Sequence, residues 1–287
     1  QSMPPDNPAA QIANMHTLFN IVTTLLLLPF GGYLVKIAMR ILPDRKEDKE
    51  EGMHLAFLVP MPASKQEHPI GFSAMYVTQI RQELNRMMGM AKENIATSFQ
   101  AVLERDVKRV ESAEATEEYI DYLNKEISQY ISNIIVHETN EKDSTAISAY
   151  FKITGNIERI GDHAADIAEI IPHLVTVRKE GDPAVSQAIA MGKKAHQMIL
   201  DALAALTAED ELAARRVMEA DDAVDYDFNA IKHTLAQEIA ADPSKVDAAL
   251  DLLMVIKYLE RIGDHAVNVA EWVQFVRTGR YKDESMF

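Results

Sequence analysis

A seven-residue sequence, Glu-Arg-Ile-Gly-Asp-His-Ala, occurs twice, at residues 158–164 and again at residues 260–266. In each copy a glutamate precedes an aspartate by four residues, and on a helix two such residues share one face about 6 Å apart. Carboxylate oxygens are the ligands that hard divalent cations prefer in proteins. Each motif therefore predicts part of a cation site. The paired acids are Glu158, Asp162, Glu260 and Asp264.

Further ligands must come from a neighbouring helix, and an acidic cluster precedes each motif. The cluster of the second copy comprises Asp221, Asp222 and Asp225, and its counterpart 104 residues earlier comprises Glu117, Glu118 and Asp121. Two opposed acidic helices repel each other strongly unless a cation lies between them. We therefore expect clusters and motifs to face one another across a bound ion.

An acidic stripe on an amphipathic helix is most often an ordinary solvated surface. Two features of the motif favour a site instead. Like charges four residues apart destabilise a helix by a few tenths of a kcal/mol, and a glycine inside a helix, here Gly161 and Gly263, costs roughly 0.5–1 kcal/mol relative to alanine. Both copies keep both features, and the glycines predict close approach by a neighbouring helix or a ligand. His163 and His265 lie between the apolar and acidic stripes and are interpreted as hydrogen-bonding residues rather than ligands.

Other chemistries find little support in the sequence. The chain contains no cysteine, which excludes disulfides, thiolate metal sites and cysteine nucleophiles. The single Glu-x-x-His pair, Glu51 and His54, lies outside the helical pattern that a di-iron enzyme needs, and no phosphate-binding glycine loop or nucleophile elbow occurs. A formal net charge of −15 disfavours nucleic-acid binding. We predict that the protein is not an enzyme and has no catalytic residues, and a carboxylate-bridged metalloenzyme is the least favoured alternative.

The motifs need rigid helices to hold them. Three sequence landmarks recur in the same order 102 to 104 residues apart, which indicates a duplicated unit. Each copy has three segments with apolar residues at helical spacing, and in the third the acidic stripe lies nearly opposite the apolar one. The predicted helices are 72–106, 112–139, 144–178, 183–208, 210–241 and 244–277. Short connections make sequential helices antiparallel, so the predicted fold is all-α, with two antiparallel three-helix bundles.

The N-terminal region has a different composition. Residues 17–35 carry no charge over 19 residues, close to the roughly 20 needed to cross a bilayer, which predicts a membrane-spanning helix. Residues 1–16 lack lysine and arginine while basic residues follow from Lys36 onward, so the downstream part is predicted to be cytoplasmic. Because the chain begins at Gln1, we expect it to be the C-terminal part of a longer protein. The predicted divisions are the end of a membrane transport domain (1–43), a juxtamembrane linker (44–71) and two repeats (72–182 and 183–279).

The duplicated Glu-x-x-x-Asp-His motif and its three-helix repeats, over roughly residues 75–280, resemble the PhoU family. The segment from His16-Thr-Leu-Phe-Asn through the apolar run to Leu42-Pro-Asp resembles the last membrane segment of bacterial sodium/phosphate cotransporters, which often carry a PhoU-like domain at their C-terminal end. The resemblance implies a role in phosphate homeostasis and a divalent or trivalent metal, such as iron, manganese or magnesium, bound by the acidic motifs. The implied metal ligands are Glu158, Asp162, Glu260, Asp264, Asp221, Asp225, Glu118 and Asp121.

Together these inferences predict the cytoplasmic, PhoU-like regulatory part of a sodium-dependent phosphate transporter, held at the inner membrane. Its expected partners are the upstream transport domain, the lipid bilayer, inorganic phosphate and sodium for the whole transporter, a protein signalling partner, and a second copy of the chain in a homo-oligomer. The alternative is a metal-free PhoU-like interaction module, which would dock a transporter or a signalling protein through its acidic faces.

Overall fold

The computed structural model describes residues 15, 17, 19, 22–23, 52–59, 72–136, 138–179, 181–281 and 284–285. The chain divides into two compact units, Gln1–Met53 and His54–Phe287. Within the described part of the chain, none of the helices combines the length and the apolar composition that a bilayer span requires. Most of the predicted membrane segment, 17–35, lies outside the described residues, as does most of the predicted linker, 44–71, and the membrane helix therefore stays a prediction.

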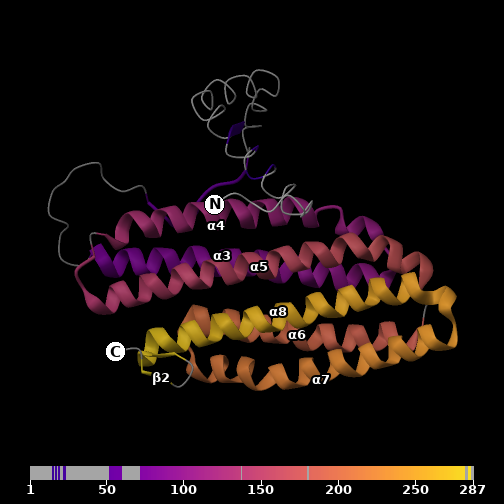
Figure 1. The fold of residues 1–287 in the computed structure, drawn as a ribbon. Helices are drawn as coiled ribbons and strands as arrows, with labels where there is room; N and C mark the ends of the chain where they lie inside the picture. Colours follow the sequence, from indigo (N-terminus) through magenta and orange to yellow (C-terminus); the bar gives the residue numbers. More distant parts are fainter. Residues whose placement is uncertain are drawn as a thin grey trace, which may run out of the picture. The chain divides into compact units, whose positions relative to one another are not determined.

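The second unit is built from helices, which confirms the all-α prediction (Figure 1). Its long α-helices are α3 (Phe72–Glu104), α4 (Ala113–Ile135), α5 (Glu141–Val177), α6 (Pro183–Ala208), α7 (Glu211–Ala241) and α8 (Val246–Thr278). Two short 3-10 helices join them, η2 (Val107–Val110) and η3 (Pro243–Lys245). A two-residue antiparallel ladder, β1 (Arg280–Tyr281) with β2 (Glu284–Ser285), follows α8 and was not expected from the sequence.

Polar side chains at the loops set where the helices begin. The side chains of Asn140, Asp182 and Asp210 each accept hydrogen bonds from two backbone N–H groups in the first turn of the following helix. Such N-caps satisfy donors that have no partner inside the helix. Helix α5 begins at Glu141, three residues before the predicted start, because Asn140 rather than Ser144 provides this cap.

Helices α3, α4 and α5 form one bundle and helices α6, α7 and α8 form the second, with consecutive helices antiparallel (Figure 1). The two bundles meet mainly through α5 against α8 and, to a lesser extent, through α3 against α6. Their buried side chains form one continuous hydrophobic core. The predicted apolar stripes of α5 and α8 all belong to it, each residue at most 2% exposed: Ile157, Ile160, Ala164, Ile167, Ile171, Leu259, Ile262, Ala266, Val269 and Val273.

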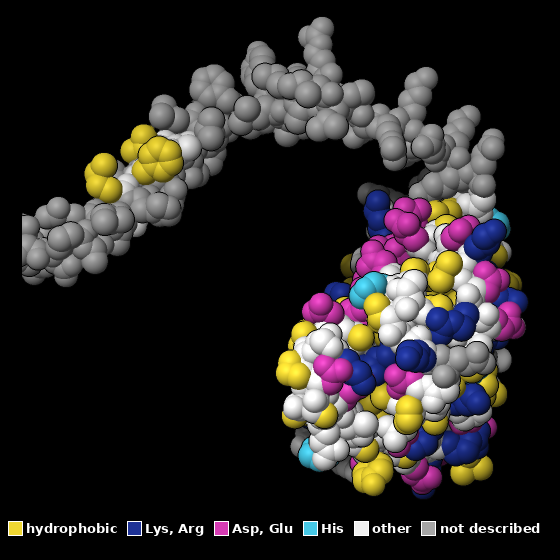
Figure 2. Space-filling model, turned by 90° about the vertical axis from the view of Figure 1, so that its right-hand side faces the viewer, with side chains coloured by type: hydrophobic (Ala, Val, Ile, Leu, Met, Phe, Trp, Pro, Cys, Tyr) yellow, Lys and Arg dark blue, Asp and Glu magenta, His cyan; other side chains and the backbone are white. Residues whose placement is uncertain are grey.

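The surface of the helical unit carries mixed charge. On the face drawn in Figure 2, acidic and basic side chains are interspersed with scattered apolar ones. Across the helical unit, charged side chains form ion pairs within or between neighbouring helices, as Arg215 does with Glu211 at 2.9 Å and Arg216 with Asp201 at 2.9 Å. Exposed pairs of this kind contribute at most about 1 kcal/mol each. Mixed charge of this kind is typical of an ordinary solvated surface.

The two motif glycines lie where helices approach each other, as the sequence predicted, but unequally. A Cβ atom on Gly161 would lie 3.0 Å from two side-chain carbons of Ile120, on α4. A Cβ atom on Gly263 would meet nothing nearer than 3.6 Å, where Asp221 on α7 and Met198 on α6 lie. The first contact is tighter than normal packing and the second is ordinary van der Waals contact. Helix α4 therefore packs on α5 so closely that a methyl group on Gly161 would require the Ile120 side chain to shift.

Alanine at these two glycines should have different effects on stability. Gly263→Ala should raise the free energy of unfolding by about 0.5–1 kcal/mol, because it removes a flexible residue from a helix interior without a clash. Gly161→Ala should be less stable than Gly263→Ala by about 1–2 kcal/mol, because the buried Ile120 side chain must shift. Urea unfolding of the two variants measures the difference, and equal midpoints would contradict the packing described here.

Candidate functional site

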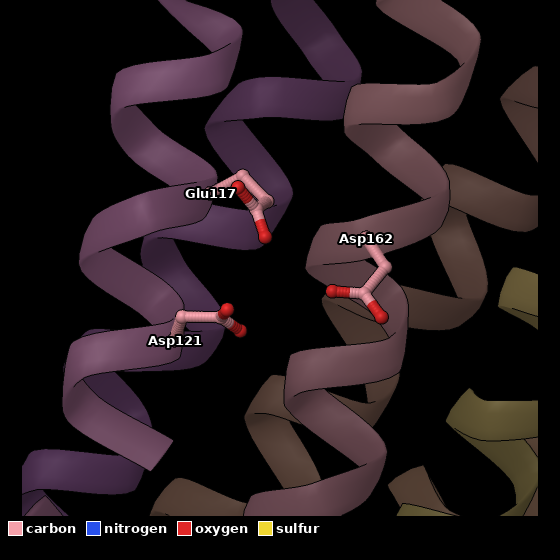
Figure 3. Close-up of side chains that lie close together, drawn as sticks. All are labelled: Glu117, Asp121 and Asp162. Carbon is pink, nitrogen blue, oxygen red and sulfur yellow. The ribbon is translucent and has the colours of Figure 1, made fainter. Parts of the chain in front are cut away.

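Acidic side chains of α4 and α5 converge on one point between the two helices. Glu117 and Asp121 project from α4 toward Asp162 on α5 (Figure 3). One carboxylate oxygen from each of the three residues lies within 4.8 Å of the other two. Oxygens on opposite sides of a divalent cation, each about 2.0–2.6 Å from it, would stand roughly 4–5 Å apart. The spacing and the donor chemistry therefore fit a hard cation. We call Glu117, Asp121, Glu158 and Asp162 the first acidic cluster.

Burial and mutual repulsion both act on this cluster. Burial is the largest cause of the raised pKa of Glu117, and the carboxylates of Asp121 and Asp162 raise it further. The pKa values of Glu158 and Asp162 are also raised, again mainly by burial, while the nearby Arg159 opposes the shift. Raised pKa values of this kind mark acids whose negative charge is only partly compensated by neighbouring groups. A bound cation would supply that compensation.

The second repeat places a related group between α7 and α8, which we call the second acidic cluster: Asp221, Asp225, Glu260 and Asp264. Among the described residues, three carboxylates with oxygens within 4.8 Å of one another occur in the first cluster and not in the second. Burial raises the pKa of Asp221 to about 6, with further increases from Asp225 and Asp264. Burial and then Glu260 raise the pKa of Asp264. The Nζ atom of Lys257 lies 2.5 Å from a carboxylate oxygen of Glu260. The two clusters are therefore related in position but differ in their charge environment.

Among the eight ligands predicted from the sequence, Glu118 lies apart from the acidic clusters. Its side chain is exposed, and it is Glu117 that joins Asp121 and Asp162. The sequence carried a signal for this, because Glu117 lies 104 residues before Asp221, the same separation as between Asp121 and Asp225. For the other seven predicted residues the structure gives positions in the two clusters, and their metal-binding role stays a prediction.

A groove of about 770 Å³ lies beside the first acidic cluster. Glu117, Asp162 and Arg159 line it, together with η2 and the exposed side of α5. Its walls also include Glu111, Glu114, Asp166 and Glu169. The first cluster is therefore accessible from solvent through an acidic groove, which favours the approach of cations.

The motif histidines lie at the interface between the two bundles rather than inside the clusters. The ring centroids of His163 and His265 are 5.7 Å apart, and His163 stacks on Tyr258 at 5.4 Å. His265 places Nδ1 3.0 Å from the side-chain oxygen of Asn156, and burial lowers its pKa to about 4. These half-buried rings join α5 to α8, which agrees with the interpretation of the histidines as hydrogen-bonding residues.

Two three-helix bundles that are related by duplication, each with a carboxylate cluster between its second and third helices, define the class of this protein. Comparison with known families then gives the family: the PhoU domain matches residues 84–171 and 189–273. The two matched stretches fall within the first and second bundles respectively. The chain belongs to the PhoU family.

Relatives and solved structures agree with this assignment. A phosphate-specific transport system accessory protein PhoU homolog of Caulobacter vibrioides is 33% identical over 217 residues, covering 74% of this chain and 93% of the relative. A PhoU homolog of Clostridium acetobutylicum is 34% identical over 207 residues, covering 71% of this chain and 94% of the relative. The crystal structure of PhoU from Pseudomonas aeruginosa superposes with a TM-score of 0.68 at 23% identity, over 72% of this chain and 99% of that one. The crystal structure of the phosphate transport system regulatory protein PhoU from Streptococcus pneumoniae superposes with a TM-score of 0.66 at 21% identity, over 74% of this chain and 100% of that one. At these identities the structures establish the shared fold.

The raised pKa of Asp221 makes stability depend on pH. Its pKa is about 6 in the folded protein against an ordinary value of 3.8, so the folded state binds more protons and stability falls as pH rises between these values. Without cations at about pH 8, Asp221→Asn should therefore raise the free energy of unfolding by about 1 kcal/mol, after allowance for solvent screening. The gain should largely disappear at about pH 3.5, where the carboxyl is mostly protonated in both states. Urea unfolding at the two pH values measures it.

Glu219→Gln provides the control, because Glu219 is exposed on the same helix. This substitution should change the free energy of unfolding by less than about 0.5 kcal/mol at either pH. If both variants gained the same stability at high pH, general charge reduction rather than the second acidic cluster would be responsible.

Proposed function

We propose that this chain is a PhoU-like regulator of phosphate transport that binds divalent cations at its two acidic clusters. The observation that carries the proposal is the convergence of the Glu117, Asp121 and Asp162 carboxylates from two helices on one point. The relatives support the phosphate-transport role, since they are described as accessory proteins of a phosphate-specific transport system. The proposed activity is binding and regulation, and it involves no bond-making chemistry.

Four carboxylates in each cluster would supply the ligands, with Glu117, Asp121, Glu158 and Asp162 in the first. An all-oxygen ligand set suits magnesium or manganese, and it also accepts iron. A cation would neutralise the repulsion between α4 and α5 and thereby hold the two helices at a fixed distance. Burial and neighbouring acids raise the pKa values of Glu117 and Asp162, which means that the ionised cluster destabilises the folded state. A bound cation would remove this repulsion and stabilise the folded protein.

We further propose that the helical unit is the cytoplasmic regulatory part of a sodium-dependent phosphate cotransporter of the inner membrane. The support comes from the sequence before the bundles: the uncharged residues 17–35, the absence of basic residues in 1–16 and the basic residues that follow. In this arrangement phosphate and sodium would bind the preceding transport domain, and the PhoU-like bundles would adjust its activity.

A metal-free interaction module is the second candidate, and basic side chains close to the clusters favour it. Arg159 lies 3.1 Å from Asp162, and Lys257 lies 2.5 Å from Glu260. These contacts show that guanidinium and ammonium groups fit beside the carboxylates. A basic surface of a transporter or a signalling protein could therefore neutralise the clusters in place of a metal ion.

Manganese binding distinguishes the cluster from ordinary surface acids. Glu117→Gln should weaken Mn²⁺ binding at the first acidic cluster by at least roughly tenfold, because it removes one carboxylate ligand. Glu118→Gln, the matched control on an exposed neighbour, should leave the affinity unchanged within about twofold. Isothermal titration calorimetry of the chelator-treated protein measures both. A wild-type protein that gives no saturable signal would exclude the metal and leave the interaction module.

Phosphate uptake tests the regulatory role. In cells that carry the module joined to its transport domain, we expect alanine at Glu158, Asp162, Glu260 and Asp264 to change how uptake responds to external phosphate, because all four carboxylates belong to the clusters. The measurement is radiolabelled phosphate uptake in phosphate-replete and phosphate-starved cells, with variant abundance checked by immunoblot. Uptake that matches the wild type in both conditions would rule out regulation through these residues.

A further inference from the structure

Part of the predicted linker is bound to the first bundle. We call residues His54–Leu58 the docked segment; it is non-helical and it precedes α3 in the chain. The backbone N–H groups of Ala56 and Phe57 both donate to one carboxylate oxygen of Glu83, at 2.9 and 2.8 Å. Leu58 is only 7% exposed and belongs to the hydrophobic core. Both backbone and side-chain atoms of the segment therefore contact the bundle.

The acceptor of these bonds, Glu83, is a fully buried acid on α3. Its side chain is 0% exposed, and its second oxygen accepts a bond of 2.6 Å from Nε of Arg86, one turn further along the helix. Arg86 also donates through a terminal nitrogen to the carbonyl oxygen of His54 at 2.5 Å. One charged pair thus contacts the docked segment at both a donor and an acceptor position.

Helix α4 completes the site through Tyr119. The Tyr119 hydroxyl accepts a bond of 3.1 Å from the backbone N–H of His54 and another of 3.0 Å from the guanidinium of Arg86. The guanidinium also lies 5.1 Å from the centre of the Tyr119 ring. The segment is therefore held by two helices of the first bundle at once.

The burial of Glu83 shows why the segment is needed. A buried carboxylate is strongly destabilising unless donors surround it. Here Arg86 satisfies one oxygen and the two N–H groups of the docked segment satisfy the other. Removal of the segment would leave one oxygen of a fully buried charge without these donors. The bundle therefore contains a site whose polar groups match a non-helical backbone with two successive N–H groups and an apolar side chain two residues after the first.

We propose that the α3–α4 face of the first bundle is a recognition site for a non-helical apolar peptide segment, and that residues His54–Leu58 of this chain occupy it. The chain then first contacts the described helices beside Glu83 on α3 and Tyr119 on α4, before the first residue of α3. Tyr119 lies two residues from both Glu117 and Asp121 on α4, so the docked segment is attached to the helix that carries two acids of the first acidic cluster. The proposal does not depend on cation binding.

Hydrogen–deuterium exchange of the full chain tests the docking. Wild-type amides at residues 55–58 should exchange far more slowly than in an unstructured peptide. Glu83→Gln replaces the carboxylate that accepts hydrogen bonds from both N–H groups by a neutral amide. Because these hydrogen bonds become weaker, amide exchange in the segment should accelerate roughly 10- to 100-fold. Ala56→Pro removes one donor while leaving every bundle residue in place, and the remaining amides should accelerate as well. Chymotrypsin cleavage after Phe57 gives an independent readout: it should be slow in the wild type and faster in both variants.

The control is Glu93→Gln, on the same helix, whose side chain is 68% exposed. It should leave exchange in the segment unchanged. Circular dichroism checks that Glu83→Gln keeps its helices. If Glu83→Gln loses them, the exchange and cleavage of Ala56→Pro decide whether the segment is docked. Wild-type exchange at the rate of an unstructured peptide would overturn the proposal, and so would variants with wild-type exchange and cleavage.

Discussion

Repulsion between carboxylates on facing helices is the constraint on which this structure depends. The hydrophobic stripes of α5 and α8 fix the positions of the helices, and the acids between α4 and α5 or between α7 and α8 must follow. Partial burial raises the pKa values of Glu117, Asp162 and Asp221, and neighbouring carboxylates raise them further. Core packing is therefore strong enough to hold together groups that repel each other. Neutralisation by a cation or a basic surface would reduce the repulsion between these carboxylates.

Duplication has produced two sites that share a plan and differ in detail. In the first, Ile120 packs tightly on Gly161 and an acidic groove opens to solvent. In the second, Gly263 has ordinary contacts and Lys257 already contacts Glu260. The same asymmetry continues at the interface, where His163 stacks on Tyr258. The two copies therefore differ in packing and in charge although their sequences share one motif.

The docked segment shows a different solution to a buried charge. Glu83 is fully buried, yet Arg86 and two backbone N–H groups give it donors on both oxygens. In the first acidic cluster, by contrast, carboxylates face other carboxylates. One bundle thus contains a buried acid with donors on both oxygens and a group of acids of which Arg159 neutralises only a part. Helix α4 contributes Tyr119 to the docked segment's contacts and Glu117 and Asp121 to the first acidic cluster. A displacement of α4 would therefore change the contacts of both.

The sequence by itself determined the six helices, their apolar stripes and the pairing of acids in each motif, because helical periodicity is a local property of the chain. It named Glu117 and Glu118 together in the acidic cluster and chose Glu118 as the expected ligand, and adjacent residues on a helix differ by about 100°; the packing of α4 on α5 places Glu117 beside Asp121 and Asp162. It also treated residues 54–58 as linker. Tertiary structure alone decided that Glu83, Arg86 and Tyr119 bind this segment, because the donors and the acceptor come from three separate parts of the chain that only folding brings together.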